Sequence, residues 1–325
     1  MDSILLVTSD DSTGGTLYEK DVYKLLNNQF EAGIYQYSQS KYKYYPNKIF
    51  IYNQLKNIKG NYKILITNLS FIYGLNLKIG NKKILIFHHF DFKNEKLLNK
   101  LFWKSISKKL NSFDKIICVS EYWRKFILEE NKYLKQEDVH IISNCFDVSK
   151  FDIAKSKKDR MQFCNKYNIP ADKILVYAGN SGFHKGTDRV VAALDRKKYH
   201  IITSGVMSEN YGTHHLSLSY DDYLELLVNV DVTVILSRLL EGWNRIAHES
   251  LLAGTPVIGS GVAGLGELLY KAGQCIYNEN SKLDEQIEYV LNNKEKIMSG
   301  CYNYVRKFDL KFFGEEWNKI ITEYL

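Results

Sequence analysis

The chain has 325 residues, of which 45% are hydrophobic and 25% are charged, and its formal net charge is +7. This length exceeds the usual size of one hydrophobic core and predicts two domains, while the composition excludes a disordered chain and no apolar run nears the roughly 18 residues of a membrane span. Five scattered cysteines without a C-x-x-C pair predict reduced thiols in a cytoplasmic protein and exclude a disulfide framework or a cysteine zinc site.

The first predicted strand, Ile4–Thr8, continues through a polar loop that contains Gly14 and Gly15 into an amphipathic helix that extends to about Phe30. Glycine lets the backbone approach a ligand closely, and a helix N-terminus supplies unpaired N–H donors. This arrangement is typical of a phosphate site. It is not the G-x-G-x-x-G dinucleotide fingerprint, because the loop contains only this one pair of glycines.

A predicted helix near Asn47–Ile58 and a strand at Lys63–Thr67 come next, and the strand Lys83–Phe87 then ends in His88 and His89. Ligands of open α/β sheets bind beyond the carboxyl ends of the strands, so these histidines are placed to reach a ligand. A hydrogen bond to a substrate or phosphate is the favoured role, and a structural role at the strand end is the alternative. The motif H-H-x-D supplies too few ligands for a metal ion, so we predict no metal site.

The predicted helix Phe92–Leu110 is amphipathic and basic. One face is apolar, and the other carries six lysines. A basic amphipathic helix can lie on an anionic membrane surface. An apolar stripe of this width more often packs on the protein's own sheet, and that is the interpretation we favour.

The α/β pattern of the first half includes a strand at Lys115–Val119, a helix at Glu121–Glu130 and a strand at Val139–Ser143. It then restarts. One helix near Lys155–Tyr167 and a new buried strand at Ile174–Ala178 predict a second domain, with the boundary at about residue 150.

The second domain opens with another glycine-rich turn, which leads into a predicted helix at Thr187–Leu194. Gly182 and Gly186 allow close backbone approach and Lys185 adds a point charge, so this turn also suits phosphate. It is not a P-loop, since no G-K-[ST] sequence closes it. Further along, a loop is predicted over Gly205–Ser217.

The most informative stretch places Glu241 in a loop after the predicted strand Val232–Leu236, and Glu249 in the predicted helix Arg245–Ala253. A helix N-terminus favours an anion, but a carboxylate beside it would be repelled by phosphate. The two glutamates are therefore expected to accept hydrogen bonds from hydroxyl groups. A nucleotide sugar has hydroxyls at both ends and phosphates between them, and it fits this pattern. The alternative is a capped helix with solvated glutamates.

Taken in order, these motifs resemble those of the retaining family 4 glycosyltransferases of the GT-B fold (glycosyl transferases group 1), over nearly the whole chain. Four features carry the resemblance. The first is the glycine loop near the N-terminus, Gly14-Gly15, and the second is S-N-C-F-D at Ser143–Asp147, where the family has P-N-G-V-D. The third is the glycine–lysine turn Gly179–Gly186, which is similar to the family's G-R…K-G phosphate site. The fourth is E-x7-E followed by A-G-T-P-V-I, at Glu241–Ile258.

The resemblance implies an α/β fold of the GT-B type, with two Rossmann-like domains and a cleft between them. Residues 1–150 would form the acceptor-binding domain, and residues 151–310 would form the domain that binds a nucleotide sugar. The C-terminal helix 311–325 would pack back on the first domain. The resemblance also implies transfer with retention of anomeric configuration and no requirement for a metal or other cofactor.

The family's functional residues carry over to the E-x7-E stretch one by one. Glu249 would hold the nucleotide ribose. Glu241 would bind hydroxyls of the donor sugar, together with the backbone N–H groups of Gly242, Trp243 and Asn244.

Elsewhere, Lys185 and the glycine turn around it would bind the diphosphate, and His88 or His89 would lie near the transferred sugar. Asn180 stands where the family usually has an arginine, so one phosphate cation is missing. We hypothesise that Arg245, at the start of the Glu249 helix, compensates. The alternative is an arginine that makes only local or acceptor contacts.

The expected donor is a nucleoside diphosphate sugar, with UDP or GDP favoured.

Residues 1–150 contain 23 Lys+Arg and 15 Asp+Glu, whereas the remaining residues contain 21 Lys+Arg and 22 Asp+Glu. This excess of basic residues suits a glycolipid or polysaccharide acceptor. It also suits contact of residues 92–110 with the cytoplasmic face of an anionic membrane. A lysine-rich solvated surface is the commoner cause. A nucleic acid is disfavoured because no aromatic–basic stacking motif is present. A non-catalytic partner subunit of this fold, or an enzyme with a protein or nucleic-acid acceptor, would also be consistent with these motifs.

Overall fold

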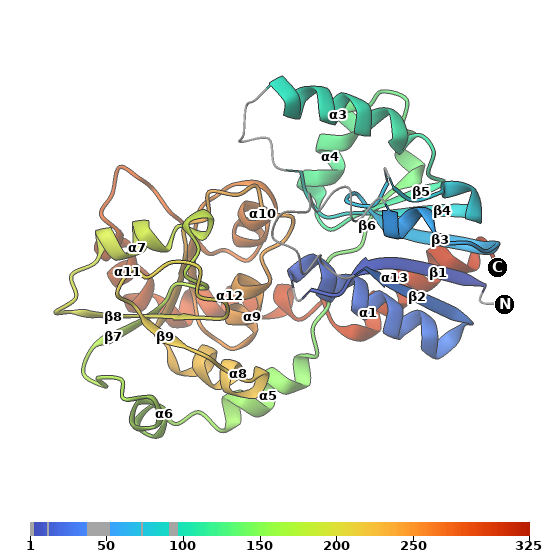
Figure 1. Cartoon of the computed structure of the whole chain (residues 1–325). Coiled ribbons are helices and arrows are strands. Elements are labelled where there is room, and N and C mark those ends of the chain that lie inside the picture. The colour runs from blue at the N-terminus through green and yellow to red at the C-terminus, as the bar shows by residue number, and fades with distance from the viewer. Residues whose placement is uncertain (1–2, 12, 38–52, 73, 91–96) are drawn as a thin grey trace. The chain divides into compact units, whose positions relative to one another are not determined.

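The computed structural model describes residues 3–11, 13–37, 53–72, 74–90 and 97–325 of the chain (Figure 1). The chain folds into two compact units. Unit 1 consists of Met1–Cys145 and Leu310–Leu325, and unit 2 consists of Phe146–Asp309. The first unit therefore contains both ends of the chain, and the second is inserted between them.

Unit 1 is built on a parallel sheet of six strands in the order β2-β1-β3-β4-β5-β6. The inner strand β1 is buried along its whole length, as expected of a parallel sheet with both faces covered. The strands are β1 (Ile4–Ser9), β2 (Ala32–Tyr37), β3 (Tyr62–Asn68), β4 (Gly80–Phe87), β5 (Lys115–Cys118) and β6 (Val139–Ile141).

The helices of unit 1 cover this sheet, with α1 and α13 on one face and α3 and α4 on the other (Figure 1). Tyr18 of α1 packs edge-on against Phe313 of α13 with ring centroids 5.3 Å apart, and Trp317 lies beside it at 6.4 Å. These aromatic contacts attach the C-terminal helix to unit 1. The elements are α1 (Gly14–Gln29), η1 (Leu77–Ile79), α3 (Leu97–Leu110), α4 (Glu121–Glu130), η2 (Gln136–Asp138) and α13 (Leu310–Thr322).

Unit 2 repeats the design with a second parallel sheet of six strands, in the order β12-β11-β10-β7-β8-β9. Apart from β8, its strands are shorter than β1, β3 and β4 of unit 1. They are β7 (Ile174–Tyr177), β8 (Tyr199–Ser204), β9 (His214–Leu216), β10 (Val232–Ile235), β11 (Val257–Gly259) and β12 (Cys275–Ile276).

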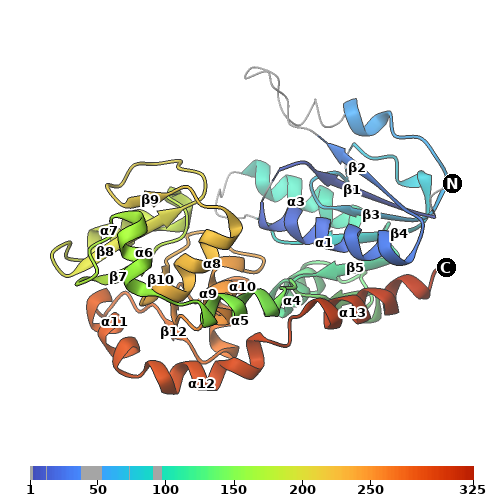
Figure 2. The same ribbon diagram turned by 90° about the horizontal axis from the view of Figure 1, so that it is seen from below.

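Helices alternate with most strands of unit 2, although β8 and β9 follow one another directly (Figure 2). They are α5 (Val148–Ser156), α6 (Arg160–Tyr167), η3 (Phe183–Lys185), α7 (Thr187–Ala193), α8 (Tyr220–Asn229), α9 (Arg245–Leu252), α10 (Ala263–Lys271), α11 (Leu283–Asn292) and α12 (Lys294–Val305). Alternation of short strands and helices in a parallel sheet is the doubly wound arrangement.

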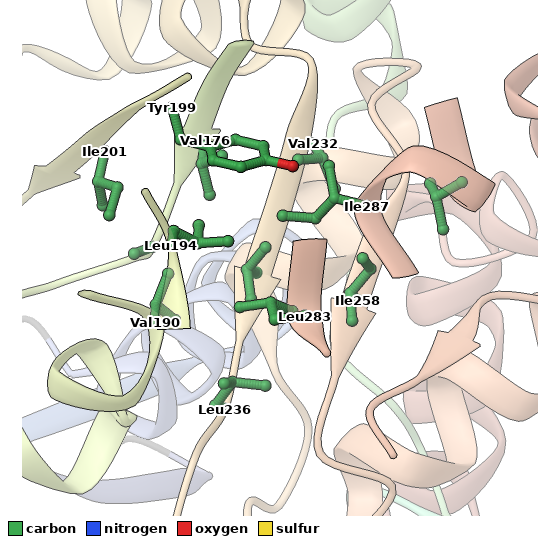
Figure 3. Packing of buried hydrophobic residues seen from close by; sticks show 13 residues of the cluster. Val176, Val190, Leu194, Tyr199, Ile201, Val232, Leu236, Ile258, Leu283 and Ile287 are labelled. Atoms are coloured by element: carbon green, nitrogen blue, oxygen red, sulfur yellow. The ribbon is translucent and has the colours of Figure 1, made fainter. Parts of the chain in front are cut away.

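A hydrophobic core holds α7 and α11 against one face of the unit 2 sheet (Figure 3). Val190 of α7 and Ile287 of α11 lie among strand residues such as Val176 and Val232, and all four are at most 1% exposed. Burying each such side chain contributes about 1.5–3 kcal/mol. The core therefore anchors α7 and α11 on the sheet.

Most predicted elements of unit 2 are confirmed, and α9 begins at the predicted residue, but two details are wrong. The single helix expected at Lys155–Tyr167 is divided into α5 and α6, because Asp159 caps α6 by accepting a hydrogen bond from the Gln162 backbone N–H at 2.9 Å. The loop expected over Gly205–Ser217 contains β9, which pairs with β8 as the edge strand. The sequence analysis also predicts neither α12 of this unit nor β2 of unit 1.

The basic helix expected over Phe92–Leu110 is present as α3, but its first predicted residues lie outside the described residues. Much of the helix expected near Asn47–Ile58 also lies outside them. In its described part, Trp103 and Ile106 are buried while Lys104 and Lys108 are exposed. This part of the apolar stripe therefore packs within unit 1. Among the described residues, no helix has the length and apolar character needed to span a membrane.

Candidate functional site

The strand order of unit 2 reverses between β7 and β10, and the main candidate residues follow these two strands. From β7 the chain moves outward to β8 and β9, and from β10 it moves in the other direction to β11 and β12. In open parallel sheets, ligands bind beyond the carboxyl ends of the strands at this switch point. Lys185 follows β7 and Glu241 follows β10. The two motifs therefore flank the place where a ligand is expected.

Lys185 and Glu241 form an ion pair, with Lys185 Nζ 2.8 Å from Glu241 Oε1. The same oxygen accepts a hydrogen bond from Ser237 Oγ at 2.9 Å. Glu241 is only 9% exposed, so water screens the pair weakly. A lysine ammonium has three N–H donors and uses one on Glu241, so it retains donors for the oxygens of an anionic ligand.

Glycines bring the backbones of this site into close contact. Gly186 has φ +76°, and a Cβ at this position would lie 1.9 Å from the carbonyl oxygen of Leu236. Gly264 donates its N–H to the Glu241 carbonyl at 2.9 Å, and a Cβ there would lie 1.8 Å from the carbonyl oxygen of Gly242. Larger residues would push the lysine turn away from β10 and the Glu241 loop away from α10.

Glu249 projects from α9, whose N-terminus is capped by Asn244. The Asn244 side chain accepts a hydrogen bond from the Ala247 N–H at 2.8 Å. Glu249 is 5% exposed, and its Oε2 accepts a hydrogen bond from the Tyr223 hydroxyl at 2.8 Å. Arg245 Nη2 lies 3.7 Å from the other oxygen, Oε1. The predicted donor-binding glutamate is thus a buried, well-oriented carboxylate.

Trp243 takes a structural position next to this site. Its Nε1–H donates to His248 Nδ1 at 3.1 Å, and His248 Nε2 lies 2.9 Å from the Val305 carbonyl oxygen. Indole only donates and a carbonyl only accepts, so His248 is the neutral tautomer with its proton on Nε2. Burial lowers the pKa of His248 to about 3, in agreement with this tautomer. These bonds attach α9 to α12.

Asn180, where the resembling family has arginine, shapes the glycine turn. Its Oδ1 accepts a hydrogen bond from the Gly182 N–H at 3.2 Å, and its carbonyl oxygen accepts one from Thr187 Oγ1 at 2.7 Å. Arg238 also contacts the turn, but it is held in a bidentate pair with Asp188 at 2.6 and 2.8 Å. Lys185, which makes a single contact with its carboxylate, is therefore the cation of this turn that we expect to contact a ligand.

In unit 1 the structure brings the glycine pair and the first histidine together. Gly14 and Gly15 are the first two residues of α1, and a Cβ on Gly15 would lie 3.2 Å from the His88 imidazole. His89 is the next residue after His88, and its side chain is exposed. The two predicted motifs of unit 1 are therefore parts of one site at the carboxyl ends of β1 and β4.

Glu19 of α1 is a member of this site that the sequence did not reveal. It is 1% exposed, and its oxygens accept hydrogen bonds from Thr8 Oγ1 and from Asn68 Nδ2, the latter at 2.8 Å. His88 Nε2 lies 2.9 Å from the same carboxylate. The donors come from β1, from β3 and from the end of β4, so the carboxylate fixes the orientation of the imidazole. Among the described residues, no group of three or more His, Cys, Asp or Glu side chains is arranged to hold a metal ion.

The family model that matches the chain is that of Glycosyltransferase Family 4, over residues 17–150. An uncharacterized glycosyltransferase of Methanocaldococcus jannaschii is 24% identical over 200 residues, which is 52% of this chain and 51% of that protein. The chain aligns with between 51% and 62% of the length of the curated relatives that it matches, all of which are named as glycosyltransferases.

Solved structures match over nearly the whole chain. Sucrose-phosphate synthase of Thermosynechococcus elongatus has a TM-score of 0.77 with 14% identity, covering 99% of this chain and 98% of that one. HepE of Anabaena in complex with UDP has a TM-score of 0.71 with 15% identity, covering 99% and 100%. At such identities the likeness concerns the fold, which is the α/β fold of GT-B glycosyltransferases.

Proposed function

We propose that this chain, which belongs to the family 4 glycosyltransferases of the GT-B fold, transfers a sugar from a nucleoside diphosphate sugar to a glycan or glycolipid, with retention of anomeric configuration. The observation that carries the proposal is the ion pair between the partly exposed Lys185 and the buried Glu241 at the switch point of unit 2, with Glu249 on the following helix.

The chemistry of these groups supports a ligand with alternating hydroxyls and phosphates. Glu241 and Glu249 are carboxylates that accept hydrogen bonds, and they suit the hydroxyls of a sugar and of a ribose. Lys185 donates to anionic oxygens and suits the diphosphate between them. As the sugar leaves, negative charge grows on the diphosphate, and a fixed cation at that position stabilises the transition state more than the ground state.

Arg245 is our candidate for the second phosphate cation, in place of the arginine that Asn180 replaces. It is the first residue of α9, and its guanidinium lies over the Phe146 ring, 4.8 Å from the centroid. This stacking restricts the side chain and directs its N–H donors along the guanidinium plane, which is the geometry that suits phosphate oxygens. Helix N-terminal N–H groups near the same residue add to the attraction for an anion.

We assign the donor nucleotide as UDP, with GDP as the alternative. HepE of Anabaena binds UDP, which favours the uracil nucleotide for a protein of the same fold. In unit 1 we assign His88, held by Glu19, to the transferred sugar, and the surface of unit 1 to the acceptor. The exposed lysines of α3 suit an anionic acceptor or an anionic membrane surface.

A thermal-shift screen with UDP, GDP, ADP and dTDP sugars tests the proposal. A ligand at 100 times its dissociation constant stabilises the folded chain by about 2.7 kcal/mol, so the correct donor raises the melting temperature measurably. The Glu249→Gln variant is the control, because it keeps the shape of the side chain and loses the charge; it should lose most of the shift. If no nucleotide sugar shifts the wild-type chain, the proposed function is wrong. A shift without turnover of the donor would instead indicate a non-catalytic, nucleotide-binding partner subunit.

A further inference from the structure

Glu249 is oriented by a partly buried tyrosine from a neighbouring helix. The Tyr223 hydroxyl, on α8, donates to Glu249 Oε2 at 2.8 Å. Burial, together with the charge of Glu249, raises the pKa of Tyr223 well above its usual value, so the hydroxyl keeps the proton that it donates. A carboxylate with one oxygen fixed in this way cannot rotate freely, and its second oxygen points in a defined direction.

Arg245 is the group toward which that second oxygen could turn. It lies one helical turn before Glu249, and the distance from Nη2 to Oε1 is 3.7 Å. A charge-assisted hydrogen bond between these groups would be about 2.7–2.9 Å long, so the ion pair is not in close contact. The guanidinium is held at its other side by the ring of Phe146. Tyr223 and Phe146 therefore hold the two charged groups slightly apart.

We propose that Tyr223 is a positioning residue, which keeps Glu249 directed at the nucleotide ribose and prevents it from closing onto Arg245. This inference rests on the proposed function, in which Glu249 binds the ribose hydroxyls. Without the Tyr223 hydroxyl, the carboxylate turns toward Arg245 and shortens the ion pair. Ribose binding then requires breaking that pair, and the affinity for the nucleotide falls.

The test is a calorimetric titration of the full chain with UDP and GDP, and with the 2′,3′-dideoxy form of the nucleotide that binds. Tyr223→Phe is expected to weaken binding of the ribonucleotide about ten-fold, the size of one charged hydrogen bond. It should change the affinity for the dideoxy nucleotide less than about two-fold, because the hydroxyls that Glu249 binds are absent there. A general loss of structure would weaken both nucleotides equally.

Two further variants make the result specific. Tyr199→Phe is the matched control, since Tyr199 is a buried tyrosine of the same unit that lies in the hydrophobic cluster of Figure 3, and its hydroxyl has no hydrogen-bond partner among the described residues. It should bind both nucleotides like the wild type. In a Glu249→Gln background, Tyr223→Phe should add less than about two-fold to the loss, because its effect acts through the Glu249 carboxylate.

Four outcomes are decisive. Equal weakening of the ribonucleotide and the dideoxy nucleotide by Tyr223→Phe overturns the inference, and so does unchanged binding of both. If the wild-type chain binds UDP or GDP and its dideoxy form equally well, Glu249 does not bind the ribose hydroxyls. That result overturns the inference but leaves the proposed donor binding intact. A wild-type chain that binds neither nucleotide overturns the proposed function itself.

Discussion

In unit 1 the Glu19 carboxylate is surrounded by Thr8, Asn68 and His88, whereas in unit 2 the Glu241 carboxylate is paired with Lys185 and Ser237. Both glutamates lie beside a point where the strand order of a parallel sheet reverses. Glu19 is more deeply buried, at 1% exposure against 9% for Glu241. Their partners differ in kind, because Glu19 is surrounded by a hydroxyl, an amide and an imidazole, whereas the partners of Glu241 include a lysine.

This difference shows how one sheet topology serves two tasks. The Glu19 carboxylate uses its oxygens within unit 1 and serves to orient the His88 ring. The Glu241 carboxylate lies beside a lysine with donors to spare, so this site can take up the charge of a diphosphate. In the proposed function, unit 1 positions a group near the reacting sugar, and unit 2 binds and stabilises the leaving group.

The glycines of the two sites provide the largest expected contrast. Gly186→Ala in unit 2 should destabilise the unit by about 4 kcal/mol, because it combines an unfavourable positive φ with a clash against the Leu236 backbone. Gly15→Ala in unit 1 meets only the His88 side chain at 3.2 Å and should cost about 1 kcal/mol. Urea unfolding, followed by fluorotryptophan NMR to separate Trp243 of unit 2 from the tryptophans of unit 1, measures both.

Gly212→Ala is the control for the φ contribution, since Gly212 has φ +67° with nothing within 4 Å of an added Cβ. It should cost about 1–2 kcal/mol. Equal losses for Gly186→Ala and Gly212→Ala would mean that the contact with Leu236 is not tight.

Glu19→Ala should destabilise unit 1 by about 3 kcal/mol, since it leaves three donors without their acceptor and opens a cavity. The tryptophan resonances of unit 1 report the urea midpoint. Glu129→Ala, on the exposed face of α4, is the control and should stay within about 0.5 kcal/mol of the wild type. If both variants behave alike, Glu19 is not an organising centre of unit 1.

Lys185→Ala should weaken UDP binding about 100-fold, because the variant loses a charge-assisted contact with the diphosphate. Uridine, which carries no phosphate, should bind the variant and the wild type within about two-fold of each other, and Lys185→Arg should recover part of the loss. Calorimetric titration measures these affinities. Equal losses for UDP and uridine would show that Lys185 supports the structure of the site and does not contact phosphate.

The buried His248 makes the stability of unit 2 dependent on pH. Its pKa is about 3 in the folded chain and about 6.5 in the unfolded chain, so the unfolded state binds more protons between these values. Stability is full above pH 6.5 and falls by about 1.4 kcal/mol per pH unit as the pH decreases toward 3. His248→Gln should reduce the slope of the unfolding free energy by about this amount between pH 6.5 and 5, as measured from the Trp243 resonance. An unchanged slope would contradict the buried neutral histidine.

The sequence was sufficient to predict the candidate site of unit 2 because its signals are local. Glu249 lies in a helix that ends just before a glycine and a buried strand. Asn244, which caps this helix, and Glu241, which pairs with Lys185, both lie within eight residues before Glu249. Only the contact of Glu241 with Lys185, which is 56 residues earlier, required the folded chain. The fold brings the two residues together because both follow strands whose carboxyl ends lie at one edge of the parallel sheet.

Glu19 could not be found in this way. It lies inside α1, where a glutamate is usually part of the solvated helix face, and its partners Asn68 and His88 are 49 and 69 residues away. Their convergence depends on β3 lying between β1 and β4, and the order of strands in a sheet is a tertiary property. The division between α5 and α6 was missed for a local reason, because a single capping aspartate interrupts an otherwise helical composition.

Release of UDP from a UDP sugar, followed by NMR of the anomeric proton, tests the central proposal most directly. The wild-type chain is expected to release UDP and to form a product with the anomeric configuration of the donor, and Glu241→Gln should slow this reaction at least about ten-fold. Inversion at the anomeric carbon would contradict the retaining mechanism. Binding of nucleotide sugars without release of UDP, in the presence of glycan and glycolipid acceptors, would contradict the proposed transfer.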